Sequence, residues 1–530
     1  MVKNRSTLWY AALLVGWAFD ILYWGKSLGI SFFIHTILTL GVLAFLVWKE
    51  GKTPAANSFF LVPLILIFSA LTFIRAEPFT RTLNHLLSIG FLGLLLLSLQ
   101  GGQWFAYTLS DYVVSGLRLI LNVVGLPFKM LTTKEEAQPS SEDGELRQGT
   151  WKRITPYLRG ILIALPLITF LAALLGEADP IFSSWLKDLI ELLSLEKLPE
   201  YILRLVLISF WTFLAAGGLL YALVKSGEEK LVGVEQPWPP RFLGSTETTI
   251  IMGAINILYF AFVTIQFRYF FGGEKNISLE GYTYAEYARR GFGELLAVAF
   301  FTLFIIMVLS SITSRESKTS RITFSAMTGA MTVFIGVMLV SSLQRLALYE
   351  SAYGFSRLRT YSHLCILWIG VLFLAILGLE VAQKHRYFTL ASLAAVAGFL
   401  LTMNVVNVDA FITRRNIQRL EVEEAALDTH FLDTLSHDAT PVLVKLADNP
   451  NLSTQERDEI GAVLACRAYV MEDREMKWQS FTLSEYRARV ALQENASLWE
   501  DYEVLTDDYW NIYVEVEQEK FYCDYWDWMD

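Results

Sequence analysis

Two groups of charged and tyrosine side chains, each next to an apolar segment, have the composition of an anion-binding site. The first group lies in residues 282–294 and comprises Tyr282, Tyr284, Glu286, Tyr287, Arg289, Arg290 and Glu294. On a helix, Arg290 is four residues from both Glu286 and Glu294, so one guanidinium group can bridge two carboxylates along one face. Because arginine binds phosphate in a bidentate manner, this group is a candidate binding site for a lipid phosphate or an anionic solute.

The second group lies in residues 345–363, where a helix is expected to leave a membrane. It comprises Arg345, Tyr349, Glu350, Tyr353, Arg357, Arg359 and His363. Together the two groups predict a basic cleft rimmed by tyrosines. The alternative is an interfacial belt, because tyrosines favour the lipid headgroup layer and arginines there reach lipid phosphates without a specific ligand.

Single polar residues inside apolar segments are a weaker signal. They are Asp20, Asn84, His85, Asn256, Asn404, Asn407 and Asp409. Each is compatible with an ion or proton path, but hydrogen bonding between membrane helices is the commoner reason for such residues.

Familiar catalytic and cofactor motifs are absent from the sequence. It lacks a Gly-Lys-Ser/Thr phosphate loop, a Gly-x-Ser-x-Gly elbow, a His-Glu-x-x-His helix and a Cys-x-x-Cys pair. His430 and His437 flank Asp433, but the six histidines never form a metal-spaced group. We therefore predict no catalytic residue, no cofactor and no metal site. A nucleic-acid partner is not expected either, because the sequence has no basic stripe with interleaved aromatic residues.

The candidate side chains must be positioned by membrane helices, because the composition excludes a soluble protein. Hydrophobic residues make up 54% of the 530 positions, charged residues make up 18%, and the mean hydropathy is +0.41. We predict an all-α polytopic membrane protein with about 11 transmembrane helices, each close to the roughly 20 residues that cross a bilayer. The predicted spans are residues 8–24, 28–48, 59–74, 83–99, 158–175, 205–224, 248–267, 295–312, 324–346, 364–379 and 388–408.

Residues 104–126 form a further apolar segment that carries two charges. Asp111 and Arg118 are seven residues apart and therefore share one helical face. We predict that this segment lies along the membrane interface. The alternative is a twelfth span with a buried Asp–Arg pair.

Charge and hydropathy divide the chain into four parts. These are an N-terminal membrane bundle (1–127), a polar charged linker (128–156), a second membrane bundle (157–412) and an acidic C-terminal extramembrane domain (413–530). From residue 414 onward, 11 basic and 26 acidic residues give a net charge of −15, whereas the preceding part carries +5.

The C-terminal domain is predicted to be mostly helical, with one exception. Residues 478–492 are typical of an amphipathic helix, whereas the alternating residues 511–517 suit a strand. Residues 499–530 are strongly aromatic and acidic, which favours packing over a calcium or partner site. Cys466 and Cys523 would pair if the domain were exported and stay reduced if it were cytosolic.

Basic residues at the first spans predict the orientation. Lys3, Arg5, Lys49 and Lys52 fall on one side, which the positive-inside rule makes cytoplasmic. Eleven spans then place the C-terminal domain outside the membrane, whereas a twelfth would place it inside.

Several segments of this sequence resemble one family. They are residues 17–30 (WAFDILYWGKSLGI), 159–166, 177–182, 282–294, 428–441 and 478–489. In this order they are similar to bacterial multi-pass membrane proteins catalogued as a domain of unknown function of the DUF4153 or DUF4173 type. The resemblance implies a bacterial cytoplasmic (inner or plasma) membrane protein and brings no catalytic residue or substrate.

Three functions are compatible with these features. The first is a non-enzymatic envelope component that senses, scaffolds or binds an envelope protein through residues 413–530. The second is a transporter or lipid-handling protein whose anionic ligand, including membrane lipids, enters at the outer cluster. The third is a membrane transferase that acts on a lipid-linked substrate with Glu286 or Glu350 as the base.

Overall fold

The computed structural model describes most of the chain, and the fold is almost entirely helical. The described residues are 2–132, scattered positions between 164 and 184, 198–228, 240–270, 292–423, and 428–523 except 451, 473–476, 508, 510, 517 and 518.

Within the described residues, six helices form the first bundle, and they include α8, whose residues were predicted to belong to the second bundle. They are α1 (Arg5–Tyr23), α2 (Ile30–Glu50), α3 (Leu61–Ile74) preceded by the 3-10 turn η1 (Ala56–Phe60), α4 (Pro78–Ser98), α5 (Leu109–Thr132) preceded by η2 (Trp104–Ala106), and α8 (Leu198–Leu220) continued by the π-helical turn η4 (Tyr221–Lys225). The residues at the helix ends account for where these helices begin. Asn4 caps α1 by accepting from Thr7 N, and Glu77 caps α4 with Pro78 at the first helical position.

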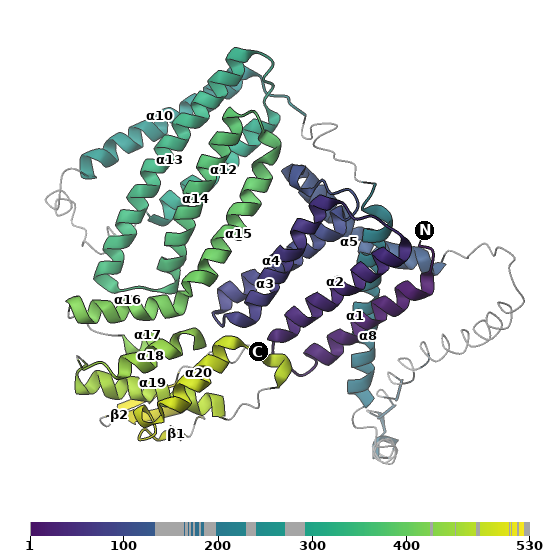
Figure 1. Cartoon of the computed structure of the whole chain (residues 1–530). Coiled ribbons are helices and arrows are strands. Elements are labelled where there is room, and N and C mark those ends of the chain that lie inside the picture. The colour runs from purple at the N-terminus through teal and green to yellow at the C-terminus, as the bar shows by residue number, and fades with distance from the viewer. Residues whose placement is uncertain are drawn as a thin grey trace, which may run out of the picture.

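The second bundle lies beside the first, with α15 next to α4 (Figure 1). Its helices are α10 (Ser245–Phe270), α12 (Phe292–Ile312), α13 (Lys318–Tyr353), α14 (Arg357–Val381) and α15 (Phe388–Val406), with the 3-10 turn η7 (His385–Tyr387) before α15. Ser317 caps α13 by accepting from Ser320 N.

Ten of the eleven predicted spans coincide with helices that are long and apolar enough to cross a membrane. The remaining one, residues 158–175, lies largely outside the described residues. The segment predicted to lie along the interface forms α5, which also meets the length and composition of a span. Asp111 caps its first turn by accepting from Thr108. Because α5 continues to Thr132, the predicted start of the linker at residue 128 is too early.

Close backbone approach at glycines brings α8 against its neighbours. A Cβ at Gly16 of α1 would lie 2.2 Å from Thr212 Oγ1, and a Cβ at Gly217 would lie 1.8 Å from the carbonyl oxygen of Val123 in α5. Small residues at such crossings are typical of membrane helices, since the gain comes from close packing rather than from expelling water.

The C-terminal region, residues 428–523, packs on one end of both bundles. It contains α17 (Thr429–Asp433), η8 (His437–Ala439), α18 (Thr440–Ala447), α19 (Thr454–Glu472), η9 (Trp478–Ser480), α20 (Leu483–Glu494) and η10 (Ala496–Leu498). The helix α16 (Val408–Glu423) runs across the ends of α13 and α14 and leads into this region (Figure 1).

A small antiparallel sheet completes the C-terminal region. Its strands β1 (Val504–Thr506), β2 (Ile512–Val516) and β3 (Glu519–Tyr522) follow in chain order, and Val514 of β2 pairs with Phe521 of β3. The strand predicted in residues 511–517 is therefore confirmed. Val514 and Phe521 are buried, which fits the packing role predicted for this aromatic segment.

A disulfide joins Cys466 in α19 to Cys523 just after β3, with a Cα–Cα distance of 5.6 Å. Of the two predicted states of these cysteines, the structure has the paired one. The bond closes a loop of 57 residues and fastens the sheet to the helices.

The C-terminal region and the first residues of the chain lie at opposite ends of the bundle (Figure 1). At one end, Lys3 N donates to Glu50 Oε2 at 2.8 Å, which joins the start of α1 to the end of α2. At the other end, Ile30 N at the start of α2 donates to the carbonyl oxygen of Phe481 at 2.9 Å.

Candidate functional site

The first predicted group lies almost wholly outside the described residues. Among its members the structure describes Glu294, an exposed residue in the first turn of α12. The other members lie outside the described residues and stay a prediction: Tyr282, Tyr284, Glu286, Tyr287, Arg289 and Arg290.

Arg357 of the second group forms an ion pair with Asp409 of α16, and both residues of the pair contact the C-terminal region. Its Nε and Nη2 each donate to the carboxylate of Asp409 at 2.8 Å, and Nη2 also donates to the carbonyl oxygen of Thr434 at 3.1 Å. Asp409, in α16, is fully buried and also accepts from Ser436 N at 2.7 Å. Such bidentate, charge-assisted hydrogen bonds are among the strongest polar contacts in proteins.

Three further members of the second group lie in the helix pair α13 and α14. Glu350 is buried, and its carboxylate is 3.1 Å from Nδ1 of His363. Arg345 is half-buried one turn earlier in α13. Within the second group, Glu350 therefore pairs with His363, whereas Arg357 pairs with Asp409.

Arg359 and Arg419 close the C-terminal end of α13. Nη1 of Arg359 donates to the carbonyl oxygen of Tyr353 at 3.1 Å, and Nη2 of Arg419 donates to that of Ser351 at 2.6 Å. Cations at this end of a helix satisfy its last carbonyl groups and interact favourably with its dipole.

A pocket of about 180 Å³ lies between these two arginines and the start of the C-terminal region. It is lined by Tyr353, Gly354, Phe355, Ser356, Arg359, Asn416, Arg419, Asp428, Phe431 and Leu432. Asn416 holds the connecting turn, since its Oδ1 accepts from Phe355 N at 2.7 Å and its Nδ2 donates to Phe355 O at 3.1 Å. Gly354 has φ +76°, a conformation that favours glycine. We call this cavity the junction pocket.

A second contact joins the C-terminal region to the turn between α3 and α4. Asp438 is 7% exposed, and its Oδ2 accepts from Ala76 N at 2.8 Å and from Glu77 N at 3.3 Å. Arg75 Nη1 is 3.6 Å from its other oxygen. Tyr361 of α14 extends this contact by donating to Glu77 Oε1 at 2.6 Å.

Arg467 supports the segment that carries Asp438. Its Nη2 donates to the carbonyl oxygens of Leu432, Asp433 and Leu435 at 3.0, 3.1 and 2.7 Å. Burial lowers the pKa of Arg467, which the nearby Asp433 carboxylate counteracts. A buried cation thus fixes the loop that the membrane helices contact.

Most of the single polar residues make hydrogen bonds between helices. Asp20 of α1 accepts from Nε and Nη2 of Arg204 in α8 at 2.9 and 2.6 Å. Asn84 of α4 and Asn404 of α15 exchange two amide hydrogen bonds of 3.0 Å. For these residues, hydrogen bonding between helices, the commoner of the two explanations, is therefore confirmed.

The residues that sequence reasoning missed are the partners in these contacts. They are Arg75, Glu77, Arg204, Tyr361, Arg419, Asp438 and Arg467. One sequence signal was available for Asp438, since residues 428–441 carry one of the segments that resemble the known family. No local pattern pointed to Arg75 or Arg204, because their partners are far away along the chain.

The comparisons with known proteins decide the family. A family model described as a domain of unknown function, DUF4153, matches residues 62–446. This chain belongs to the DUF4153 family. The matched residues run from α3 to α18 and so include both contacts between the membrane helices and the C-terminal region. No curated protein and no solved structure matches the chain.

At its opposite end, this DUF4153 protein has a second buried charge cluster. Glu380 in α14 is fully buried, accepts from Arg315 Nη1 at 2.6 Å and lies 2.9 Å from His385 Nδ1. Arg315 also stacks on Phe324, with its guanidinium carbon 3.9 Å from the ring centre. The cluster ties the ends of α12, α13 and α14 together.

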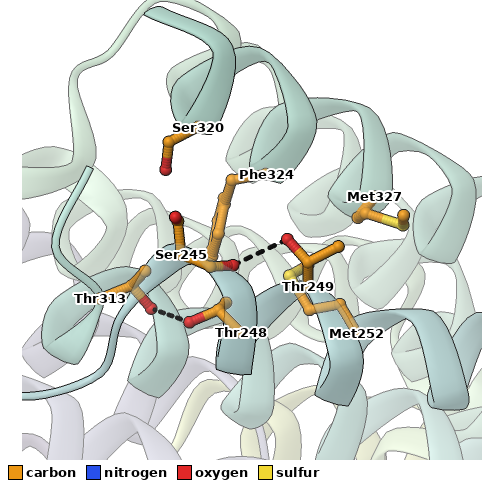
Figure 2. A pocket seen from close by; sticks show the side chains of 8 residues that line it. All are labelled: Ser245, Thr248, Thr249, Met252, Thr313, Ser320, Phe324 and Met327. Carbon is orange, nitrogen blue, oxygen red and sulfur yellow. Dashed lines mark hydrogen bonds between the residues drawn. The ribbon is translucent and has the colours of Figure 1, made fainter. Parts of the chain in front are cut away.

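The DUF4153 chain also has a small pocket near this end, between α10, the end of α12 and α13 (Figure 2). Thr248 and Thr313 hydroxyls meet at 3.0 Å, and Thr249 donates to the carbonyl oxygen of Ser245 at 2.8 Å. Its volume of about 10 Å³ corresponds to one water molecule. Within the described residues, no three histidine, cysteine or acidic side chains are grouped to hold a metal ion.

Asp438 makes the stability of this DUF4153 protein depend on pH. Burial raises the pKa of Asp438 above its usual 3.8, against the lowering effect of Ala76 N and Arg75, and the nearby Asp409 raises it further. As the pH rises above 3.8, the unfolded chain loses this proton first, so the contribution of Asp438 to stability falls until the pH passes its folded pKa.

The variant Asp438→Asn keeps an oxygen for both backbone donors but does not ionise. We expect its stability relative to the natural protein to increase between pH 4 and 7, measured as the apparent Tm in detergent. A constant difference in apparent Tm between the variant and the natural protein from pH 4 to 7 would contradict this expectation.

Proposed function

We propose that the protein is a non-enzymatic component of the bacterial cell envelope whose membrane helices present the acidic C-terminal domain, residues 413–530, to a partner protein. The observation that supports this proposal is the pair of buried contacts at Asp409 and Asp438. A domain that only needed tethering would require one flexible connection. Here two buried carboxylates hold the domain in one orientation on the ends of α4 and α14.

The net charge and the exposed side chains of the domain indicate the kind of partner. Residues 414–530 carry 26 acidic and 11 basic residues, so a basic partner surface is attracted to them. Tyr486 and Tyr509 are 51% and 85% exposed, and tyrosine is enriched in binding surfaces. We therefore propose a basic envelope protein as the partner.

We further propose that the N-terminus is cytoplasmic and that the domain lies outside the cytoplasmic membrane. In support, α4 ends beside Ala222 through Gln100 Nε2 at 2.8 Å, whereas α8 begins at the other end, where Trp24 Nε1 donates to Glu200 at 2.9 Å. The chain must change ends between α4 and α8, which requires an odd number of crossings there. An odd total number of membrane crossings places the N-terminus and the domain on opposite sides of the membrane. The Cys466–Cys523 disulfide is typical of an exported compartment.

Orientation is tested by fusing alkaline phosphatase, which is active only after export, after Asp530. We expect high activity from this fusion and low activity from a fusion at Lys52. Activity only at Lys52 would reverse the proposed orientation.

The role of the domain is tested by complementation of a deletion strain with an envelope defect. We expect the full chain to restore the envelope and a chain lacking residues 426–530 to fail, although it reaches the membrane. The double variant Glu286→Ala, Arg290→Ala should restore it. The opposite pattern would favour a ligand-handling function at the first predicted group.

A further inference from the structure

We infer that the face of the three-stranded sheet turned away from α19 binds an extended basic segment of the partner protein. Tyr513 and Tyr522 stack on arginine or lysine side chains of that segment, and Glu515 pairs with them. The inference rests on the proposed function and deepens it, because it names the surface of the C-terminal region that the partner occupies.

The register of the strands decides which side chains share this face. Tyr513 of β2 pairs with Leu505 of β1 and with Tyr522 of β3. Paired residues of antiparallel strands lie on the same side of a sheet, and successive residues alternate between the two sides. One row of aromatic and apolar side chains therefore crosses all three strands. The opposite side of the sheet, with Val514 and Phe521, is buried and packs on α19.

The face is accessible in the part of the chain that the structure describes. Tyr522 is 46% exposed, Tyr513 and Leu505 are half-buried, and Glu515 is exposed. The sheet lies on the side of the C-terminal region away from the two bundles (Figure 1). A partner protein can therefore reach the face without displacing a membrane helix.

The chain's own Lys520 shows which chemistry this face accepts. Its Nζ lies 4.3 Å from the ring centre of Tyr513, a cation–π contact, and the ring of Tyr522 lies 6.0 Å from that of Tyr513. Glu515 is opposite Lys520 in the register, and Glu503 directly precedes β1. Among the described residues, neither carboxylate has a cation at ion-pair distance. Aromatic rings beside such carboxylates favour arginine and lysine side chains.

Charge also decides between the possible occupants of the face. Residues 524–530 of the chain itself carry three aspartates and no basic residue, so the acidic face repels them. A second copy of this acidic region is disfavoured for the same reason. A basic segment is attracted by the same charges, and it is therefore the occupant that the face selects.

The test measures the binding of two fluorescent decapeptides to the purified full chain in a non-ionic detergent, by fluorescence anisotropy. One peptide alternates arginine with serine, and the other has citrulline, which is uncharged and similar in shape, in place of arginine. We expect the citrulline peptide to bind roughly tenfold more weakly or not at all. A chain that ends at Cys523 should bind the arginine peptide as the natural chain does. Markedly tighter binding by this shorter chain would assign the face to residues 524–530 and overturn the inference.

Two matched pairs of variants connect binding to the face. Glu515→Gln should weaken binding of the arginine peptide roughly tenfold, the loss expected for one charge-assisted contact. Glu494→Gln, the same change at the end of α20, should not. Lys520→Gln should strengthen binding, because it frees the ring of Tyr513, whereas Lys445→Gln on α18 should not. All four substituted residues are exposed, so the variants should keep the Tm of the natural protein.

The deletion strain separates failure of this inference from failure of the proposed function. The double variant Glu515→Gln, Tyr522→Ser should reach the membrane and not restore the envelope, whereas Glu494→Gln should restore it. The inference alone is overturned if the double variant restores the envelope while the chain lacking residues 426–530 fails, if the matched variants change the Kd equally, or if the citrulline peptide binds as well as the arginine peptide. Restoration by the chain lacking residues 426–530 overturns the proposed function, and this inference with it.

Discussion

Replacing Arg357 by alanine is expected to cost about 3–5 kcal/mol of folding free energy, because it leaves a buried carboxylate without its partner. Asp409 is 0% exposed and accepts two hydrogen bonds from Arg357. Without them, its negative charge keeps one backbone donor, Ser436 N. The measurement is denaturant-induced unfolding in mixed micelles, in which proteolysis of the C-terminal region reports the unfolded fraction.

The double variant Arg357→Met, Asp409→Asn should recover much of this loss, because it removes both charges and leaves an amide oxygen for Ser436. Arg414→Ala is the control for loss of charge alone, since Arg414 is exposed on the same α16 helix. A cost for Arg357→Ala no larger than that of Arg414→Ala would show that the pair does not fasten the C-terminal region.

Removing the disulfide by the double substitution Cys466→Ala, Cys523→Ala is expected to destabilise the C-terminal region by about 2–5 kcal/mol. The bond closes a loop of 57 residues. For a loop of this size, the chain-entropy model gives roughly 4 kcal/mol. The loss should appear as faster proteolysis of residues 428–523, while the helices of the two bundles stay protected.

Alkylation in intact cells shows whether the bond is formed in the natural protein. In a Cys365→Ala background, which removes the cysteine of α14, a thiol-reactive polyethylene glycol should label the denatured chain only after reduction. Labelling of both cysteines without a reductant would contradict the disulfide and would remove one support for an extracytoplasmic domain.

The membrane-spanning segments were predictable from the sequence because hydropathy is a local property. A run of about 20 apolar residues has few stable solutions other than a membrane helix, and the predicted spans matched helices wherever the structure describes them. For α5, two charges seven residues apart predict a position along the interface. The structure shows that one of them, Asp111, is satisfied locally by Thr108 at the helix start.

The sequence also determined which polar residues need a partner, without determining the partner. Asp20 and Asn404 lie in apolar surroundings, so each was expected to form hydrogen bonds between helices. The structure supplies Arg204 and Asn84, which are 184 and 320 positions away along the chain. Nothing in the local sequence contains that information.

Only the tertiary structure decided what the second predicted group is. Arg357 and Arg359 are two residues apart and looked equivalent in the sequence, but a separation of two turns a helix by about 200°. One therefore faces Asp409 and is neutralised, whereas the other lines the junction pocket. Residue types specify which chemistry is available, but the packing of helix ends and of the C-terminal region specifies which groups meet, because those contacts join segments that only the folded chain brings together.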